Sequence, residues 1–136
     1  MRPSLLLLAP SLLLLCSLSL RAGGDFTALR DDIVVARKTL ITMVLYRDKR
    51  GPEQQRRVRD SAEAVSARFT RLLAPPGKSA AFTELKETWL AFKATREAEL
   101  VPAILAGERE KAEFLASGIQ KARLDRMYAL IDAMEP

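Results

Sequence analysis

Three breaks divide residues 25–136 into four long blocks with helical periodicity. The breaks are Gly51-Pro52, the run Ala74-Pro75-Pro76-Gly77, and Gly107. Glycine and proline are the strongest interrupters of regular structure, and no apolar/polar alternation typical of a strand occurs between these breaks. Leucine and alanine are abundant, and only 6% of the residues are aromatic. This composition favours helix packing over a sheet core, so we expect an all-α fold.

Each block is expected to form an amphipathic helix. The helices are predicted at about 26–50, from Pro52 as a first helical residue, from Ser79 as an N-cap, and at about 108–134. Pro102 is expected to kink or end the third helix unless packing shelters its last turn. The core-facing residues are predicted to be Phe26, Leu29, Ile33, Leu40, Ile41, Val44, Val58, Ala62, Val65, Phe69, Leu72, Phe82, Leu85, Trp89, Phe92, Leu100, Ala112, Leu115, Ile119, Met127, Leu130 and Met134.

Four helices of roughly 22 to 27 residues measure about 33 to 40 Å each, and the breaks between them are short. Short connections make successive helices antiparallel neighbours. The sequence therefore predicts an antiparallel up-down-up-down four-helix bundle over residues 25–136. No repeat of fixed period links the blocks, which disfavours a solenoid.

Residues 1–24 have the organisation of a secretory signal peptide. A basic start at Arg2 is followed by an apolar run over residues 5–20 and by the small residues Ala22 and Gly24. We expect cleavage before Asp25 and a periplasmic or secreted protein. The alternative is an inner-membrane anchor formed by residues 5–20. Sixteen residues span only about 24 Å as a helix, which is short of the roughly 30 Å hydrocarbon core.

Removal of the signal peptide lowers the net charge. The chain has 22 basic and 17 acidic residues, a net charge of +5. Arg2 and Arg21 lie in the signal, so residues 25–136 carry 20 basic and 17 acidic residues and a net charge of +3. The densest basic run, residues 47–59, contains acids and no interleaved aromatic residues. It indicates a solvated helix corner rather than a nucleic-acid site.

The absence of histidine restricts the chemistry that the chain can perform. Without imidazole there is no Ser-His-Asp triad, no Cys-His dyad, no His-ligated haem and no Glu-x-x-His di-iron motif. The single cysteine, Cys16, lies in the signal segment. We therefore expect a protein that is not an enzyme and that holds neither a metal nor another cofactor.

Several arginines occur where helical periodicity predicts apolar core residues. Arg37 projects onto the face of Phe26, Ile33 and Val44, Arg96 continues the apolar row of the third helix, and Arg123 interrupts that of the fourth, with Arg126 at its margin. One interpretation is that they extend to water or pair with acids. The other is that they converge, with Trp89 as lining, on a pocket for a carboxylate or another small anion. The candidate ligand-binding residues are Arg37, Trp89, Arg96, Arg123 and Arg126.

The sequence of residues 84–112 resembles part of a known family of sensor domains. The stretch 84–96, which contains Trp89, Phe92 and Lys93, is followed by Leu100 and by the turn at Ala106-Gly107. This pattern resembles the third and fourth helices of the four-helix-bundle sensor domain of methyl-accepting chemotaxis receptors. The resemblance covers about residues 25–134. It implies a periplasmic module for signal transduction that senses small molecules, often as a homodimer.

The sequence departs from this family where it stops at Pro136, without the second membrane helix, HAMP linker and signalling coiled coil of a receptor. Two functions stay open. The first is a stand-alone sensor-like bundle that binds a small molecule or contacts a membrane receptor. The second is a structural or interaction protein that dimerises or docks on a partner without a small-molecule ligand.

Overall fold

The computed structural model describes residues 13–135, and the burial of side chains from residue 24 onward. Of the predicted signal peptide, residues 1–12 lie outside the described residues, and residues 13–24 belong to the first helix. The elements are α1 (Leu13–Leu45), the 3-10 turn η1 (Arg47–Lys49), α2 (Pro52–Phe69), α3 (Ser79–Thr95), the π-helical turn η2 (Arg96–Leu100), α4 (Val101–Ala106), α5 (Arg109–Ser117) and α6 (Ile119–Met134). Residues 13–135 contain no strand, which confirms the all-α prediction.

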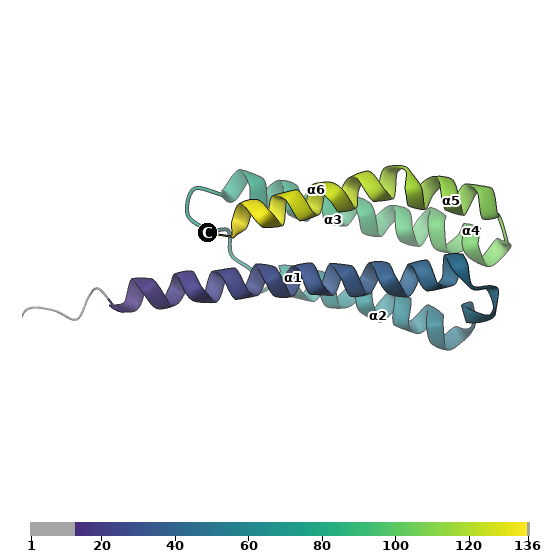
Figure 1. The fold of residues 1–136 in the computed structure, drawn as a ribbon, viewed down its shortest axis with the longest axis horizontal. Coiled ribbons are helices and arrows are strands. Elements are labelled where there is room, and N and C mark those ends of the chain that lie inside the picture. The colour runs from purple at the N-terminus through teal and green to yellow at the C-terminus, as the bar shows by residue number, and fades with distance from the viewer. Residues whose placement is uncertain (1–12, 136) are drawn as a thin grey trace, which may run out of the picture.

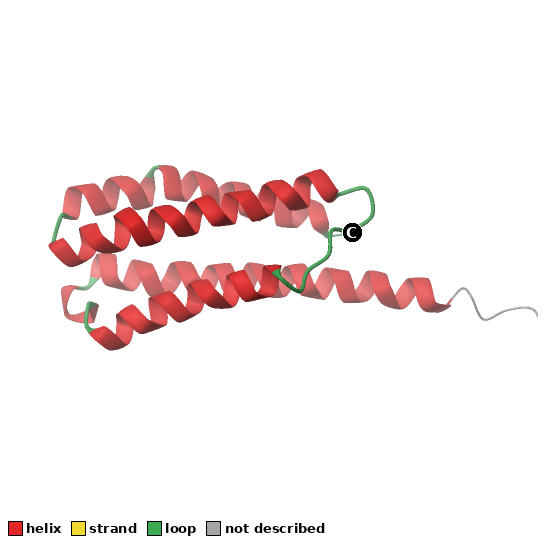
Figure 2. Cartoon of the chain, turned by 180° about the vertical axis from the view of Figure 1, so that it is seen from behind, coloured by secondary structure: helices red, strands yellow, loops and turns green. Residues whose placement is uncertain are grey.

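These elements build four rods that lie side by side (Figures 1 and 2): α1, α2, the continuous run α3–η2–α4, and the pair α5–α6. The helix α1 packs on α2 and on α6, and α3 packs on α6. The loop 70–78 joins α2 to α3, and a tight turn at Gly107 joins α4 to α5. The all-helical architecture is established, and the antiparallel up-down-up-down order stays a prediction.

Ion pairs tie neighbouring rods together at the surface. Four pairs join α1 to α2, α2 to α3, α3 to α6 and α6 to α1: Arg68 with Asp32, Lys93 with Glu63, Arg126 with Glu84, and Arg30 with Asp132. Exposed pairs of this kind add little stability each, because water and salt screen them. Their positions show which rods are neighbours.

The core consists of two apolar clusters, in which nearly all of the predicted residues are buried. One cluster is centred on Phe26, Ile33, Val65, Leu85 and Trp89, and a second, smaller one on Met43, Leu100 and Ile104. The Phe26 and Phe82 rings meet edge to face at 6.1 Å, and Trp89 stacks on Phe92 at 5.7 Å. The predicted positions Ile41 and Val44 are only half-buried, since Ala36 and Met43 face the core of α1 instead.

Several helix ends lie at their predicted positions, but the first helix, predicted at about 26–50, begins at Leu13 and ends at Leu45. Gly51 is the N-cap of α2 and Pro52 is its first residue, as expected. Lys78, and not Ser79, is the N-cap residue of α3, so the predicted Ser79 cap is wrong; no side chain caps that end. Gly107 ends α4 with a φ of 74°, a conformation that costs glycine nothing. The sequence thus predicted the start of α2, the break at Gly107 and the end of α6 at Met134.

Pro102 neither ends nor bends the third rod out of the core. A proline has no N–H to donate to the carbonyl four residues before it, so the α-helical pattern fails at this point. The π-helical turn η2 replaces an α-helical turn here, and its Val101 N–H donates to the Arg96 carbonyl. The rod then continues as α4 to Ala106. The wider turn keeps Leu100 and Ile104 in the core.

The predicted fourth helix is interrupted at Gly118, between α5 and α6. Before the break, Ala112 and Leu115 face the core, so an unbroken helix would bury Ile119 next. In the structure Ile119 is 49% exposed and Gln120 is buried. The expectation for Ile119 was wrong because the break shifts the helical register by one residue. Leu124, Met127, Ile131 and Met134 then follow Gln120 into the core.

Candidate functional site

The four predicted arginines do not meet in one pocket. Arg96 is buried in the core, Arg37 is exposed on α1, and Arg126 is exposed on α6, where it pairs with Glu84. Arg123 is half-buried and faces α3. The structure therefore does not bring these four arginines together around one ligand pocket. Each guanidinium group has its own surroundings.

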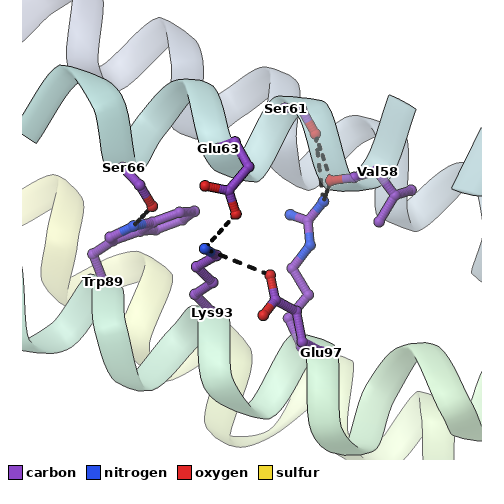
Figure 3. Close-up of polar contacts among 8 residues, drawn as sticks. Val58, Ser61, Glu63, Ser66, Trp89, Lys93 and Glu97 are labelled. Carbon is purple, nitrogen blue, oxygen red and sulfur yellow. Dashed lines mark hydrogen bonds and ion pairs between the residues drawn. The ribbon is translucent and has the colours of Figure 1, made fainter. Parts of the chain in front are cut away.

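Arg96 enters the core at the start of η2 and is 1% exposed. Its Nη1 donates to the Ala36 carbonyl of α1 at 2.8 Å, and its Nη2 donates to the Val58 carbonyl of α2 at 2.6 Å. A longer bond of 3.4 Å reaches the Ser61 hydroxyl. Figure 3 shows Val58 and Ser61 at this contact. Arg96 therefore braces three rods through backbone oxygens and has no carboxylate partner among residues 24–135.

Burial lowers the pKa of Arg96 to about 10, because removal from water disfavours the charged form. Glu97, the neighbouring acid, acts weakly in the opposite direction. The side chain stays charged at neutral pH, and backbone carbonyls supply the acceptors that a buried cation requires. With its fork already occupied on two sides, Arg96 is a structural brace in this structure and not an open anion receptor.

Trp89 belongs to the same sealed interior. Its ring is 1% exposed and its indole N–H donates to the Ser66 hydroxyl of α2 at 3.1 Å (Figure 3). One turn further along α3, Lys93 lies between Glu63 and Glu97 at 2.5 and 3.8 Å. Both groups connect α2 to α3. Trp89 lines no recess that a ligand enters, so the structure gives it a packing role.

Arg123 and Arg126 lie together on the α3 side of α6. Arg123 Nη1 donates to the Thr95 hydroxyl at 2.7 Å and to the Gln120 side-chain oxygen at 3.1 Å. Arg126 makes a two-pronged pair with Glu84, with N–O distances of 2.6 and 2.8 Å. The pair lowers the pKa of Glu84, mainly through the hydrogen bonds from Arg126. The register shift at Gly118 is the reason that Arg123 leaves the centre of the core stripe.

Arg37 does not lie at the centre of the core face of α1, because Ala36 occupies that position at 0% exposure. Arg37 is exposed and borders a shallow recess between α1, α3, η2 and the α5–α6 break. The recess is also lined by Leu40, Ile41, Phe92, Leu100, Ala116, Gln120, Lys121 and Leu124. Its floor is apolar, and its enclosed space admits about one water molecule.

Gln120 is the polar residue that sequence reasoning missed. It is 3% exposed, it borders the recess, and its Nε2 donates to the Phe92 carbonyl at 2.8 Å. The only signal in the sequence was Gly118 two residues earlier, which marks a point where the helical register can change. Gln120 and Arg96 are the two buried polar residues among those whose burial is described, and both donate to backbone carbonyls.

Two further properties of the described residues bear on the site. Residues 13–135 contain no group of three or more acidic, histidine or cysteine side chains placed to hold a metal ion. Within the same residues, none of the helices combines the length and the apolar character that a membrane crossing needs.

Comparisons with known proteins return no match: no family model, no curated protein and no solved structure is similar to this chain at a significant level.

Proposed function

We propose that residues 25–136 form an antiparallel up-down-up-down four-helix bundle that binds a small carboxylate, as a sensor-like module exported by its signal peptide. The helix contacts and the ring of four ion pairs support the bundle, because they join α1, α2, α3 and α6 each to two neighbours. The recess beside Arg37 supports the ligand.

The observation that carries this proposal is the position of Arg37. Its guanidinium group is exposed at the rim of an apolar recess, and no carboxylate of residues 24–135 lies within ion-pair distance of it. Lys121, the other cation at the rim, is already paired with Asp125 at 2.5 Å. Arg37 is thus the one predicted arginine whose fork stays available to an anion.

The shape of the recess restricts the ligand. Leu40, Leu100 and Leu124 line its floor, while Arg37 stands at its opening. A guanidinium group binds a carboxylate with two parallel hydrogen bonds, and an apolar floor favours a short alkyl group. The enclosed space admits only about one water molecule, so the ligand that fits best is a carboxylate as small as acetate, whose methyl group enters the recess while its charged end stays near water.

The wider role follows the sequence resemblance. A bundle of this kind that binds a carboxylate outside the cytoplasm would pass ligand occupancy to a membrane receptor or to a second copy of itself, in signal transduction or chemotaxis. In this proposal the protein is periplasmic and catalyses no reaction. The homodimer and the receptor contact are parts of the proposal that the recess itself does not require.

Thermal unfolding in the presence of a carboxylate series tests the ligand. Acetate, propionate, butyrate and hexanoate are compared with the alcohols of equal chain length at constant ionic strength. A ligand at ten times its Kd stabilises the folded state by about 1.4 kcal/mol, which raises the Tm of a domain of this size by several degrees. We expect a saturable rise with at least one carboxylate and none with its alcohol.

Arg37→Gln is the matched variant, and Arg71→Gln is its control. Arg71 is exposed at the end of α2, away from the recess. Arg37→Gln should lose the carboxylate-induced rise in Tm, and Arg71→Gln should keep it. Equal shifts for the two variants, or no shift with any carboxylate, would contradict the proposal.

A second candidate is a structural or interaction protein without a small-molecule ligand. It is favoured by the engagement of Arg96, Arg123 and Arg126, whose guanidinium groups already bind groups of the protein. This candidate predicts no carboxylate-dependent rise in Tm, together with a molecular mass in light scattering that increases with protein concentration.

A further inference from the structure

The basic charge of the folded region is concentrated at one end of the molecule. Residues 46–60 hold six basic and three acidic side chains, a net charge of +3. The rest of residues 25–136 holds fourteen of each sign. The whole net charge of residues 25–136 therefore lies in this segment, which comprises η1, the Gly51 turn and the first half of α2.

Most of these cations are not neutralised by the protein. Arg47, Arg56 and Arg59 are exposed, and no carboxylate of the described chain lies within ion-pair distance of them. Lys49 has only a 3.7 Å contact with Asp48. Arg57 is paired with Glu53 at 2.5 Å. Unpaired cations of one sign on a small area create a positive field that extends about a Debye length from the surface.

Exposed apolar side chains lie beside these cations. Leu45 is 67% exposed and Tyr46 is 56% exposed, directly before Arg47. Leu105, near the end of α4, is 45% exposed. Figure 1 shows the end of α1, the start of α2 and the end of α4 at the same end of the molecule. We call Leu45, Tyr46, Arg47, Lys49, Arg56, Arg59 and Leu105 the basic tip.

Arg50, the remaining cation of this segment, is bonded to backbone carbonyls and is not part of the basic tip. The Arg50 guanidinium donates to the carbonyls of Met43 at 2.9 Å, Val44 at 3.4 Å and Ile104 at 3.0 Å. It thus satisfies carbonyls at the end of α1 and adds a second bond at the Ile104 carbonyl, which already accepts from the Gly107 N–H. The Tyr46 N–H donates to the Thr42 carbonyl at 3.0 Å. Arg50 thus joins the end of α1 to α4 within this segment.

We propose that the basic tip docks on a lipid surface that contains anionic headgroups. Its cations face the phosphates, and Leu45 and Tyr46 enter the headgroup region, where a tyrosine ring with a polar end is stable. Three apolar side chains are too few for a stable protein interface, which buries about 800 Å² on each partner. Tyr46 is the lone aromatic residue of the basic tip, which disfavours a single-stranded nucleic acid, because its bases need several aromatic side chains to stack on.

Co-sedimentation of the full chain with vesicles tests this proposal. Neutral phosphatidylcholine vesicles are compared with vesicles in which one lipid in three is phosphatidylglycerol, at low and at physiological salt. The difference between the two lipid compositions isolates the electrostatic part from any insertion by residues 5–20. Each cation near an anionic surface contributes about fivefold in binding. We expect tighter binding to the anionic vesicles, weakened by salt.

The deciding variant reverses three tip cations: Arg47→Glu, Arg56→Glu and Arg59→Glu. Its control makes the same change in net charge elsewhere, with Lys38→Glu, Arg71→Glu and Lys86→Glu at exposed positions. The tip variant should lose about 100-fold or more in binding to anionic vesicles, and the control should lose less than about fivefold. Circular dichroism shows whether each variant is folded.

A milder pair, Leu45→Ser and Tyr46→Ser, should weaken binding while its salt dependence stays unchanged. The proposal is overturned if the tip variant and its control lose binding equally, or if the protein does not distinguish the two vesicle compositions. It is also overturned if a DNA oligonucleotide binds more tightly than the anionic vesicles. None of these results depends on Arg37, so the carboxylate proposal stands or fails separately.

Discussion

The two halves of the molecule, α1 with α2 and α3 to α6, differ in how regularly their helices pack into the core. In α1 and α2, apolar residues return to the core at regular intervals, and neither helix is interrupted between Phe26 and Phe69 except at the connecting turn. In the other half each rod contains an irregularity: η2 in the run α3–η2–α4, and Gly118 between α5 and α6. The Gln120 bond to Phe92 joins these two rods close to both irregularities.

This difference shows where polar side chains enter the core. Arg96 begins η2, and Gln120 follows Gly118 by two residues. Both side chains donate to backbone carbonyls of other helices, and the recess beside Arg37 lies at the same level. The regular half supplies the carbonyls of Ala36 and Val58, while the interrupted half supplies the donors. The irregular half therefore supplies the buried polar donors, Arg96 and Gln120, whereas the regular half supplies Arg37 at the recess.

Among the substitutions that test this difference between the two halves, Arg96→Ala should cause the largest loss of stability. The change removes the buried brace between the two halves and leaves a cavity, so the free energy of unfolding should fall by about 3 kcal/mol. Urea denaturation followed by circular dichroism measures it.

Arg96→Met separates packing from charge in the same experiment. Methionine fills most of the space, and no buried charge remains to be compensated, so this variant should lose about 1.5 kcal/mol or less. A loss as large as that of Arg96→Ala would mean that the hydrogen bonds to Ala36 and Val58, and not volume, hold the two halves together.

Gly118→Ala should have the next largest effect, because it acts on the second irregularity. A Cβ at this position would lie 2.7 Å from the Phe114 carbonyl oxygen, which is part of the backbone and cannot turn away. We expect a loss of about 2 kcal/mol in the free energy of unfolding, measured by urea denaturation. Gly51→Ala is the control, since nothing lies within 4 Å of its added Cβ. Similar losses for the two variants would show that the break at Gly118 is not sterically required.

The smallest loss of stability is expected from breaking the exposed ion pair between Glu84 of α3 and Arg126 of α6. Arg126 lowers the pKa of Glu84 in the folded state below its unfolded value. The stability from this pair is therefore present above a pH of about 4.5 and is lost as the pH falls through the folded pKa. Glu84→Gln should lower the Tm slightly at pH 7 and by less at pH 3. An undiminished effect at pH 3 would show that packing, not charge, is responsible.

Arg96 serves as the internal reference for that pH dependence. Its pKa, lowered to about 10, still lies well above neutrality, so Arg96 is charged in the folded and the unfolded states throughout pH 5 to 8. The loss caused by Arg96→Met should therefore be constant over this range. The contrast with Glu84→Gln separates a buried cation from an exposed ion pair.

Sequence reasoning identified the helices and failed at two particular registers. The buried seam of α2, from Val58 to Phe69, could be predicted because period and propensity agree along an uninterrupted helix. Arg37 was misplaced because the core face of α1 is centred one residue earlier, on Ala36, a small residue with little apolar signal. Arg123 was misplaced because Gly118 shifts the helical register. A glycine in a sequence marks a place where the register can change but does not indicate the size of the shift.

The sequence by itself determined that this is an all-α protein with breaks at Gly51, Pro75-Pro76 and Gly107, since local propensity and periodicity are properties of neighbouring residues. Only the tertiary structure decided what each arginine does. The partners of Arg96 lie 60 and 38 residues away in the chain, whereas Arg37 has an apolar recess beside it. Such partners depend on how the rods pack, and a periodic pattern along one helix contains no information about the helix opposite.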